Sequence, residues 1–217
     1  MTLLVYAVTD RPPLGELPPG VEGAPVWTIS HAGLSALVSR HETAPVIDER
    51  SGWAYEQVIE SGMAQAAVLP MRFGSTLADR DAVVQWLDER ARELSGVLER
   101  IRDRVEVSVR AVWAQGDETA AQVGTGREYM EARLEPERRA RALRERIGQA
   151  LDPLADASRY RLLVRPSAPV TAAFLVPRRA TETFVARAAE LDRELAEADL
   201  TCTGPWPAYS FVGSDNA

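Results

Sequence analysis

Residues 105–113 read VEVSVRAVW, and this stretch decides how the second half of the chain folds. Apolar residues alternate there with Glu106, Ser108 and Arg110, which is typical of a strand with one buried face. The residues that follow predict a helix over 129–155, strands over 161–164 and 170–176, a helix over 181–197, and a final strand from Leu200 through Val212. The order β-α-β-β-α-β is that of the split βαβ, or ferredoxin-like, arrangement.

The residues before position 103 predict a separate, smaller domain. Pro70 lies within a strand expected over 67–75, and because proline cannot donate to a sheet ladder, that strand lies at an edge or is bulged. The other elements expected are strands over 3–8, 26–29 and 34–38 with a hairpin turn at 31–33, a helix over 53–65, and one helix from about 79 to 103. We therefore expect two α+β domains: 1–103 with a small mixed sheet and helices, and 104–217 with the ferredoxin-like arrangement.

The composition is that of a globular protein. The 217 residues are 46% hydrophobic and 26% charged, and the net charge is −7. The acidic balance argues against binding to nucleic acid or to anionic membranes, because such binding relies on basic residues that meet phosphates. The first ten residues lack the basic start and long apolar core of a signal peptide, and no apolar stretch is long enough for a membrane span. We expect a soluble cytoplasmic protein.

The scarcity of reactive side chains disfavours an enzyme. All 25 basic residues are arginine, which excludes a phosphate-binding loop with lysine and Schiff-base catalysis. Cys202 is the single cysteine and we interpret it as a small buried residue, so the chain has no intrachain disulfide. His31 and His41 are interpreted as loop or turn residues, and they are too few for the common zinc-finger sites. We assign no catalytic, cofactor-binding or metal-binding residue.

Two further segments have a functional and a structural interpretation. The basic run 138–146 could bind a phosphate or an acidic partner, but interleaved glutamates favour a solvated helix face. Gly124-Thr125-Gly126 does not directly follow a strand and lacks the third glycine of a nucleotide-binding loop, which favours a plain loop.

Two segments combine proline, glycine and aromatic residues. Residues 68–75 read VLPMRFGS, and residues 203–212 read TGPWPAYSFV. Such segments either pack as core and edge strands or form a surface for another chain, since aromatic residues and edge strands suit both roles. The candidate partner-binding residues are Pro70, Arg72, Phe73, Gly74, Pro205, Trp206, Pro207, Tyr209 and Phe211. We expect the two segments to lie close together or to flank the junction between the domains.

The first segment resembles the V-L-P-[VM]-R-F-G-[TS] signature of the gas vesicle protein F/L family (GvpF/GvpL), and the second resembles the family's T-G-P-W-P-[PA]-Y-[SN]-F-V ending. The resemblance covers nearly the whole chain, although family members carry His near the position of Tyr55. It implies a two-domain α+β fold whose second domain is a modified ferredoxin fold. It also implies a non-enzymatic accessory or minor structural protein, located at the gas vesicle in the cytoplasm.

The implied partners are the small apolar major shell subunit, GvpA, and other gas vesicle accessory proteins, without nucleic acid, membrane or cofactor. The chain would then support gas vesicle assembly by binding that subunit. The alternative is a small-molecule-binding regulatory protein or an enzyme on a ferredoxin-like fold, because that fold hosts many functions.

Overall fold

The computed structural model describes residues 1–46, 48–114, 126–162 and 168–212, with residues 126–133 described by their backbone alone. The chain forms two compact units, which we describe separately. The first unit comprises Met1–Arg104 and the described residues from Trp206 on, and the second comprises Val105–Pro205. The chain passes from the first unit into the second between Arg104 and Val105, whereas the expected boundary was near residue 103. The expected domain 104–217 differs from the second unit, because its last residues pack with the first.

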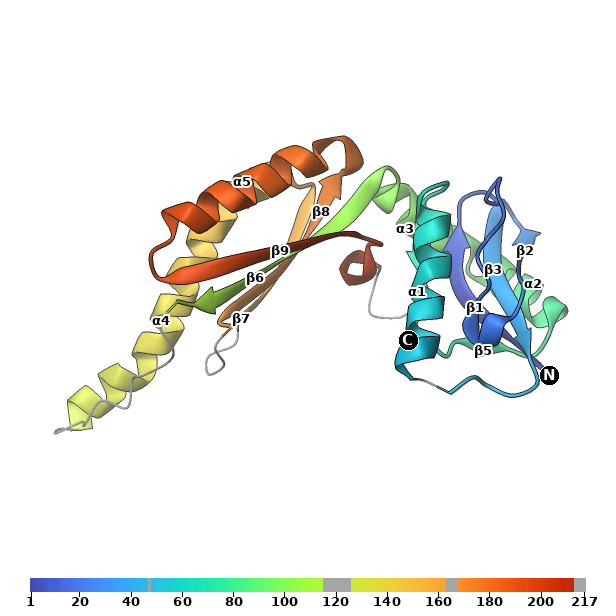
Figure 1. The fold of residues 1–217 in the computed structure, drawn as a ribbon, viewed down its shortest axis with the longest axis horizontal. Coiled ribbons are helices and arrows are strands. Elements are labelled where there is room, and N and C mark those ends of the chain that lie inside the picture. Colours follow the sequence, from blue (N-terminus) through green and yellow to red (C-terminus); the bar gives the residue numbers. More distant parts are fainter. Residues whose placement is uncertain (47, 115–125, 163–167, 213–217) are drawn as a thin grey trace. The chain divides into compact units, whose positions relative to one another are not determined.

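The first unit is built on one sheet with the strand order β2-β3-β1-β4, in which β5 also pairs with β1 (Figure 1). Its helical segments are a short 3-10 turn, η1, before β2, and three α-helices after β3. The strands are β1 (Thr2–Thr9), β2 (Val26–His31), β3 (Leu34–His41), β4 (Val68–Pro70) and β5 (Thr76–Leu77); the helices are η1 (Val21–Gly23), α1 (Glu49–Met63), α2 (Arg80–Glu89) and α3 (Ala91–Ile101).

The strand pairings of this sheet are antiparallel, so the expectation of a mixed sheet was wrong. The reason is the tight hairpin between β2 and β3, in which Ala32 and Gly33 both have positive φ angles, 50° and 77°. Two positive φ values are the hallmark of the type I′ turn, which joins antiparallel strands. Strand β3 lies between β2 and β1, and its pairing with β1 is antiparallel as well.

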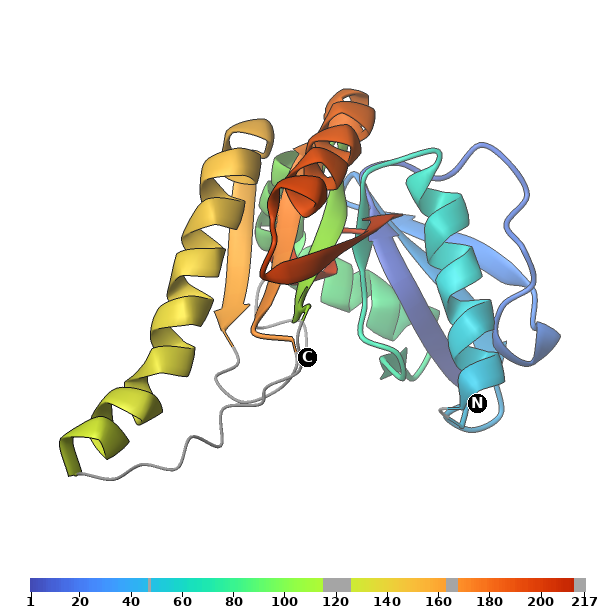
Figure 2. The same cartoon turned by 60° about the vertical axis from the view of Figure 1, so that its left-hand side comes forward.

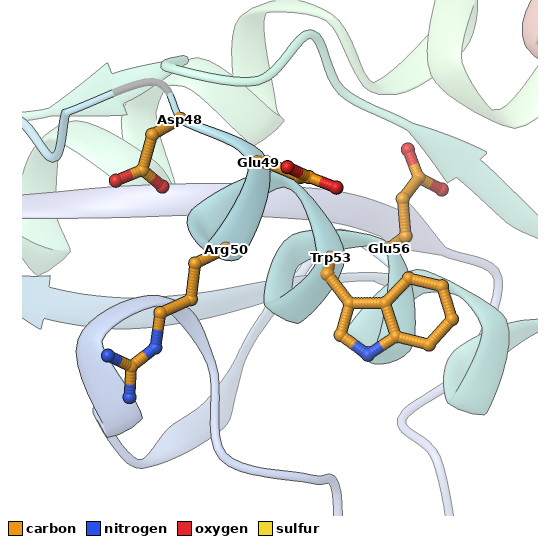
Figure 3. Close-up of a pocket in the computed structure, with 5 residues that line it drawn as sticks. All are labelled: Asp48, Glu49, Arg50, Trp53 and Glu56. Carbon is orange, nitrogen blue, oxygen red and sulfur yellow. The ribbon is translucent and has the colours of Figure 1, made fainter.

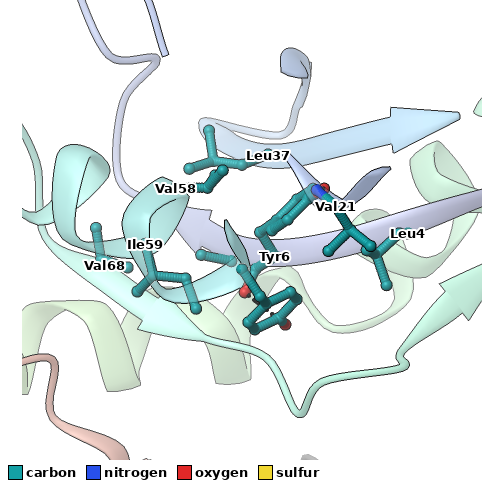
Figure 4. Close-up of a cluster of buried hydrophobic side chains, with 9 residues drawn as sticks. Leu4, Tyr6, Val21, Leu37, Val58, Ile59 and Val68 are labelled. Carbon is teal, nitrogen blue, oxygen red and sulfur yellow. Dashed lines mark hydrogen bonds between the residues drawn. The ribbon is translucent and has the colours of Figure 1, made fainter. Parts of the chain in front are cut away.

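The core of the first unit lies between the sheet and α1. Strand β1 is buried from Leu3 to Thr9, as expected for a strand that is covered on both faces. Helix α1 covers one face, and α2 and α3 cover the other (Figure 1). The cluster beneath α1 joins aliphatic side chains from five elements around two tyrosines (Figure 4). Its members are Leu4, Tyr6, Ala7, Val21, Leu37, Tyr55, Val58, Ile59 and Val68.

Two helix boundaries differ from the sequence prediction. Helix α1 begins at Glu49, four residues before the predicted start, because Asp48 and Ser51 form a reciprocal capping box. The helix predicted over 79–103 is two helices, α2 and α3, separated at Arg90. Arg90 has a ψ angle of 8°, while its N–H still donates to the Trp86 carbonyl oxygen and its carbonyl accepts from Leu94 N–H. One helix therefore ends and the next begins without a loop.

The second unit is a four-stranded sheet in the order β7-β8-β6-β9 with two long helices. Helices α4 and α5 contact each other and both contact β8, so they cover the same face of the sheet (Figure 2). The elements are β6 (Arg104–Trp113), α4 (Gly126–Leu151), η2 (Asp152–Leu154), β7 (Ala157–Leu162), β8 (Val170–Pro177), η3 (Arg178–Ala180), α5 (Thr181–Glu194) and β9 (Ala198–Trp206).

Several predicted bounds in this half need correction. Strand β7 begins at Ala157 instead of residue 161, and α5 ends at Glu194, where Leu195 takes an extended conformation. Helix α4 spans Gly126–Leu151 instead of 129–155, with Pro136 inside it. The final strand ends at Trp206 instead of Val212 because Pro205 and Pro207 lack the N–H that a ladder needs. The chain then forms the 3-10 turn η4 (Tyr209–Phe211).

Four arginine side chains of the basic run 138–146 contact other residues of the second unit. Arg139 lies over the ring of Trp113 and Arg144 over the ring of Tyr160, at 4.6 and 4.5 Å from the ring centroids. Arg141 and Arg146 pair with glutamates on α4 and beyond α5. These contacts favour the structural interpretation of the run. Gly124 and Thr125 of the glycine-rich segment lie outside the described residues.

Candidate partner-binding site

Helix α1 is the frame of the candidate site, and its N-terminus is fixed by side-chain caps. The Asp48 carboxylate accepts the Ser51 N–H at 2.8 Å, and the Ser51 hydroxyl accepts the Asp48 N–H at 2.9 Å. The Ser51 N–H, together with the Ser51 hydroxyl that lies 2.7 Å from the same carboxylate oxygen, holds the pKa of the Asp48 carboxyl below its ordinary value. The cap orients the first two turns of the helix, which carry Trp53, Tyr55 and Glu56.

Tyr55 links α1 to the edge of the sheet by hydrogen bonds and ring contacts. Its hydroxyl lies 3.0 Å from the carbonyl oxygens of Val5 and Tyr6 and 2.9 Å from that of Met71, and it donates to this group of acceptors. Its ring packs against Tyr6 on one side and Phe73 on the other, with centroid distances of 4.9 and 4.7 Å. Burial, with smaller effects of Glu56 and Tyr6, raises the pKa of the Tyr55 hydroxyl, which therefore stays a hydrogen-bond donor.

The segment 68–75 is a short edge strand followed by a bulge, as Pro70 predicted. Pro70 is buried opposite Ala7, the Met71 N–H still donates to the Tyr6 carbonyl oxygen at 2.9 Å, and the chain then bulges away from β1 until the Ser75 carbonyl accepts the Val5 N–H. Between them the chain turns, and the Arg72 carbonyl accepts both the N–H and the hydroxyl of Ser75, at 3.0 and 2.7 Å. Gly74 has a φ angle of 91°, which favours glycine at this point of the turn. The turn leaves Arg72 exposed and places the ring of Phe73 against α1.

The segment 203–212 is divided between the two units. Its first three residues belong to the second unit, and the third of them, Pro205, is exposed. The residues from Trp206 on belong to the first unit. Pro207 and Ala208 are buried, and Trp206 and Tyr209 stay partly exposed. The Tyr209 hydroxyl donates to the carboxylate of Glu56 on α1, with distances of 2.9 and 2.8 Å to its two oxygens. Phe211 is half-buried in the turn η4.

The two sequence segments therefore both reach α1 within the first unit. Phe73 contacts Tyr55, and Tyr209 bonds the next residue along the helix, Glu56. Burial is the main cause that raises the pKa of both Glu56 and Tyr209, while their mutual hydrogen bond lowers that of Glu56. Within the first unit, Phe73 of the first segment and Tyr209 of the second therefore contact neighbouring residues of α1.

The sequence interpretation missed an open depression beside this contact. It has a volume of about 640 Å³ and is lined by Asp48, Glu49, Arg50, Trp53 and Glu56 (Figure 3). Trp53 is 69% exposed, although tryptophan is a costly side chain to leave in water. A signal was present in the sequence, because Trp53 lies outside the apolar stripe formed by Ala54, Val58 and Ile59.

His41 was interpreted as a loop or turn residue, and this was wrong. It ends strand β3, is only 5% exposed, and joins a buried chain of hydrogen bonds. Its Nε2 lies 2.7 Å from Ser39 Oγ and its Nδ1 3.1 Å from a Glu22 carboxylate oxygen. Ser39 Oγ in turn lies 2.7 Å from the Tyr6 hydroxyl, which accepts the Val21 N–H at 2.9 Å. The arrangement joins η1 to the sheet, and since Ser39 is fully buried, its hydroxyl offers no exposed nucleophile.

Over the described ranges, no group of three or more His, Cys, Asp or Glu side chains is arranged to hold a metal ion. None of the helices in the described part of the chain has both the length and the hydropathy that a bilayer span requires.

Comparison with known proteins points to one family. The family model described as "Gas vesicle synthesis protein GvpL/GvpF" matches residues 2–213. Gas vesicle protein F2 of Halobacterium salinarum is 31% identical over 198 residues, which are 89% of this chain and 83% of that protein. Gas vesicle protein F of a Streptomyces species is 30% identical over 237 residues, covering 98% of this chain and 100% of that protein.

Solved structures show the same fold. The crystal structure of GvpF from an Anabaena species superposes with a TM-score of 0.86 at 21% identity, covering 98% of this chain and 96% of that one. GvpF from Microcystis aeruginosa gives a TM-score of 0.82 at 18% identity, covering 98% and 99%.

Proposed function

The chain belongs to the GvpL/GvpF family of gas vesicle synthesis proteins, and on that premise we propose that it is an accessory or minor structural protein that binds the small apolar major shell subunit and supports gas vesicle assembly. The observation that carries the proposal is the meeting of both motifs on α1. Phe73 and Tyr209 contact neighbouring residues of that helix, beside the exposed Trp53. Exposed aromatic residues clustered on one ordered surface are typical of protein–protein interfaces.

The physical need for such a protein follows from the chemistry of its proposed partner. A small, very apolar subunit that is exposed to water before assembly will aggregate, because large exposed apolar patches associate without specificity. Reversible binding to an ordered aromatic surface suppresses that route while it leaves the subunit available to the growing shell. The proposal places the chain at the gas vesicle, with other gas vesicle accessory proteins as further partners.

The proposal includes a finer description of the fold. Strand order β7-β8-β6-β9, together with two helices on the same face, supports a ferredoxin-like arrangement for the second unit. The remaining residues, 1–103, would form the other domain, completed by the segment from Trp206 on. A crystal structure of this chain with both helices on one face of four antiparallel strands would be the direct test.

The test of the proposed function is a pull-down of the major shell subunit with the full chain and with Arg72→Ala, Trp206→Ala and Tyr209→Ala. We expect weaker capture by these variants, with melting temperatures within a few degrees of the parent. An unfolded variant would indicate a core role instead, because loss of a buried tryptophan costs about 3–5 kcal/mol. Capture that survives in every folded variant would move the interface away from these residues, and no capture by the parent would refute the proposal.

We also propose that the chain has no catalytic turnover of its own. The absence of lysine supports this, as does the use of His41 in the hydrogen-bonded chain that joins η1 to the sheet. Stoichiometric zinc in protein purified without added metal, or a thermal shift with micromolar nucleotide, would contradict it and favour the alternative of a small-molecule-binding protein.

A further inference from the structure

The outer face of α1 carries an aromatic side chain between two acids. Glu49, Trp53 and Glu56 are spaced by four and three residues, which places them on one side of the helix. Figure 3 shows the three side chains around the depression at the N-terminal half of α1. We name this surface, made of Glu49, Trp53 and Glu56, the α1 face.

The charge of the α1 face is unbalanced. Asp48, Glu49 and Glu56 contribute three carboxylates to the lining of the depression, against the one guanidinium of Arg50. The Asp48 carboxylate is occupied by the helix cap, and Glu56 accepts from the Tyr209 hydroxyl. Among the described side chains, no cation forms an ion pair with Glu49. A cation that entered the depression would therefore meet acceptors that the fold leaves uncompensated.

We propose that the α1 face docks a segment of the partner that carries an arginine or lysine side chain next to aliphatic side chains. The cation would lie over the Trp53 ring and between the two carboxylates, while the aliphatic groups would cover the rest of the indole. Cation–π contact and charge pairing favour the same occupant, and both strengthen when water leaves the site. This inference rests on the proposed function, because it takes the major shell subunit as the partner that carries the segment.

Other occupants fit the α1 face less well. A purely aliphatic segment would cover Glu49 and Glu56 without a counter-charge, and removing an unpaired carboxylate from water is costly. An acidic segment would be repelled by the lining and by the net charge of −7. A second copy of this chain could supply an arginine, and the experiment must separate that case.

The experiment measures the affinity of the full chain for the major shell subunit of the same organism, kept soluble in mild detergent, at low and high salt. The variants are Trp53→Ser and Glu49→Gln. The matched controls are Leu14→Ser, which removes a side chain that is 96% exposed away from α1, and Glu99→Gln, which removes an exposed acid on α3. Melting temperature and light-scattering mass are measured for each protein.

We expect Trp53→Ser to weaken binding by about 10-fold or more, as for a central aromatic residue of an interface. Glu49→Gln should weaken binding several-fold at low salt and much less at high salt, because screening removes its contribution. Both controls should bind within about 2-fold of the parent, and all variants should melt like the parent, since the changed side chains are exposed.

Three outcomes would overturn the inference. If Trp53→Ser and Glu49→Gln bind like the parent, the α1 face is not the docking site, and the proposed function stands. If Trp53→Ser lowers the light-scattering mass without changing shell-subunit binding, the α1 face pairs with a second copy. If the parent itself does not bind the subunit, the proposed function fails and the inference fails with it.

Discussion

At the scale of single residues, Tyr55 contacts several parts of the candidate site through both its hydroxyl and its ring. Its hydroxyl, with one proton to donate, lies within hydrogen-bond distance of three carbonyl oxygens, and its ring packs against both Tyr6 and Phe73. Buried carbonyl groups need a donor, because an unsatisfied one costs free energy comparable to a lost hydrogen bond. We therefore expect the loss of the Tyr55 hydroxyl to destabilise the sheet edge beside the bulge.

We predict that Tyr55→Phe lowers the free energy of unfolding by about 1–3 kcal/mol, because it removes a buried hydrogen-bond donor while the ring is retained. Urea denaturation measures the change. Tyr160→Phe is the control, since the Tyr160 hydroxyl is half-buried and bonds the Asp152 carboxylate at 2.8 Å. An effect of Tyr55→Phe no larger than that of Tyr160→Phe would show that water replaces the missing donor.

A second residue-scale prediction concerns Gly20, which lies against the Tyr6 hydroxyl. A Cβ atom at this position would be 2.1 Å from that oxygen, so Gly20→Ala must displace Tyr6 and break its bonds to Ser39 and Val21. We expect a loss of about 1–3 kcal/mol, measured by thermal or urea unfolding. Gly96→Ala on α3 is the control, because a Cβ there meets nothing within 4 Å and alanine favours a helix. Equal effects of the two substitutions would contradict this prediction.

At the scale of elements, the contact between α1 and η4 is a half-buried pair, Glu56 and Tyr209. Burial raises the pKa of Glu56 above its ordinary value of 4.5. An acid whose pKa is raised on folding holds its proton more tightly in the folded state. Its contribution to stability is therefore full below the ordinary value and is lost as the pH rises through the raised one.

Glu56→Gln cannot ionise, and its amide can still accept the Tyr209 hydroxyl. We predict that the melting temperature of Glu56→Gln minus that of the parent increases as the pH rises from about 4 to 7. Differential scanning calorimetry at several pH values gives this difference. The other carboxylates are the same in both proteins, so their effect on the melting temperature cancels in the difference. A difference that is constant with pH would mean that folding leaves the pKa of Glu56 at its ordinary value, and a difference that falls would mean that folding lowers it.

The sequence patterns were reliable where they are long and periodic. The strand over 105–113 and the edge position of Pro70 follow from alternation and from proline chemistry, and both are present. The break at Arg90 was missed because a single non-helical residue barely shifts the apolar stripe. The contact between Tyr209 and Glu56 joins residues 153 positions apart, and no local pattern specifies such a partner.

At the scale of the whole molecule, the chain leaves the first unit once and returns to it. It crosses after Arg104 into the second unit and crosses back at Trp206, so the first unit is discontinuous in sequence. Each unit has its own core: that of the first surrounds Tyr6 and Tyr55, and that of the second includes the packed rings of Phe174 and Phe184. We therefore expect a substitution or truncation after Trp206 to destabilise the first unit.

We predict that a stop codon in place of Trp206 destabilises the first unit and spares the second. The truncated chain loses the buried Pro207 and Ala208 and the donor to Glu56, so α1 should lose part of its cover. Hydrogen exchange followed by mass spectrometry should show faster exchange in α1 and little change in α5. Phe184→Ala is the reciprocal control, because it empties a fully buried site in the second unit at a cost of about 3–5 kcal/mol. It should accelerate exchange in α5 and leave α1 protected. Faster exchange in the second unit alone after truncation would mean that residues beyond Trp206 stabilise the unit they follow in sequence.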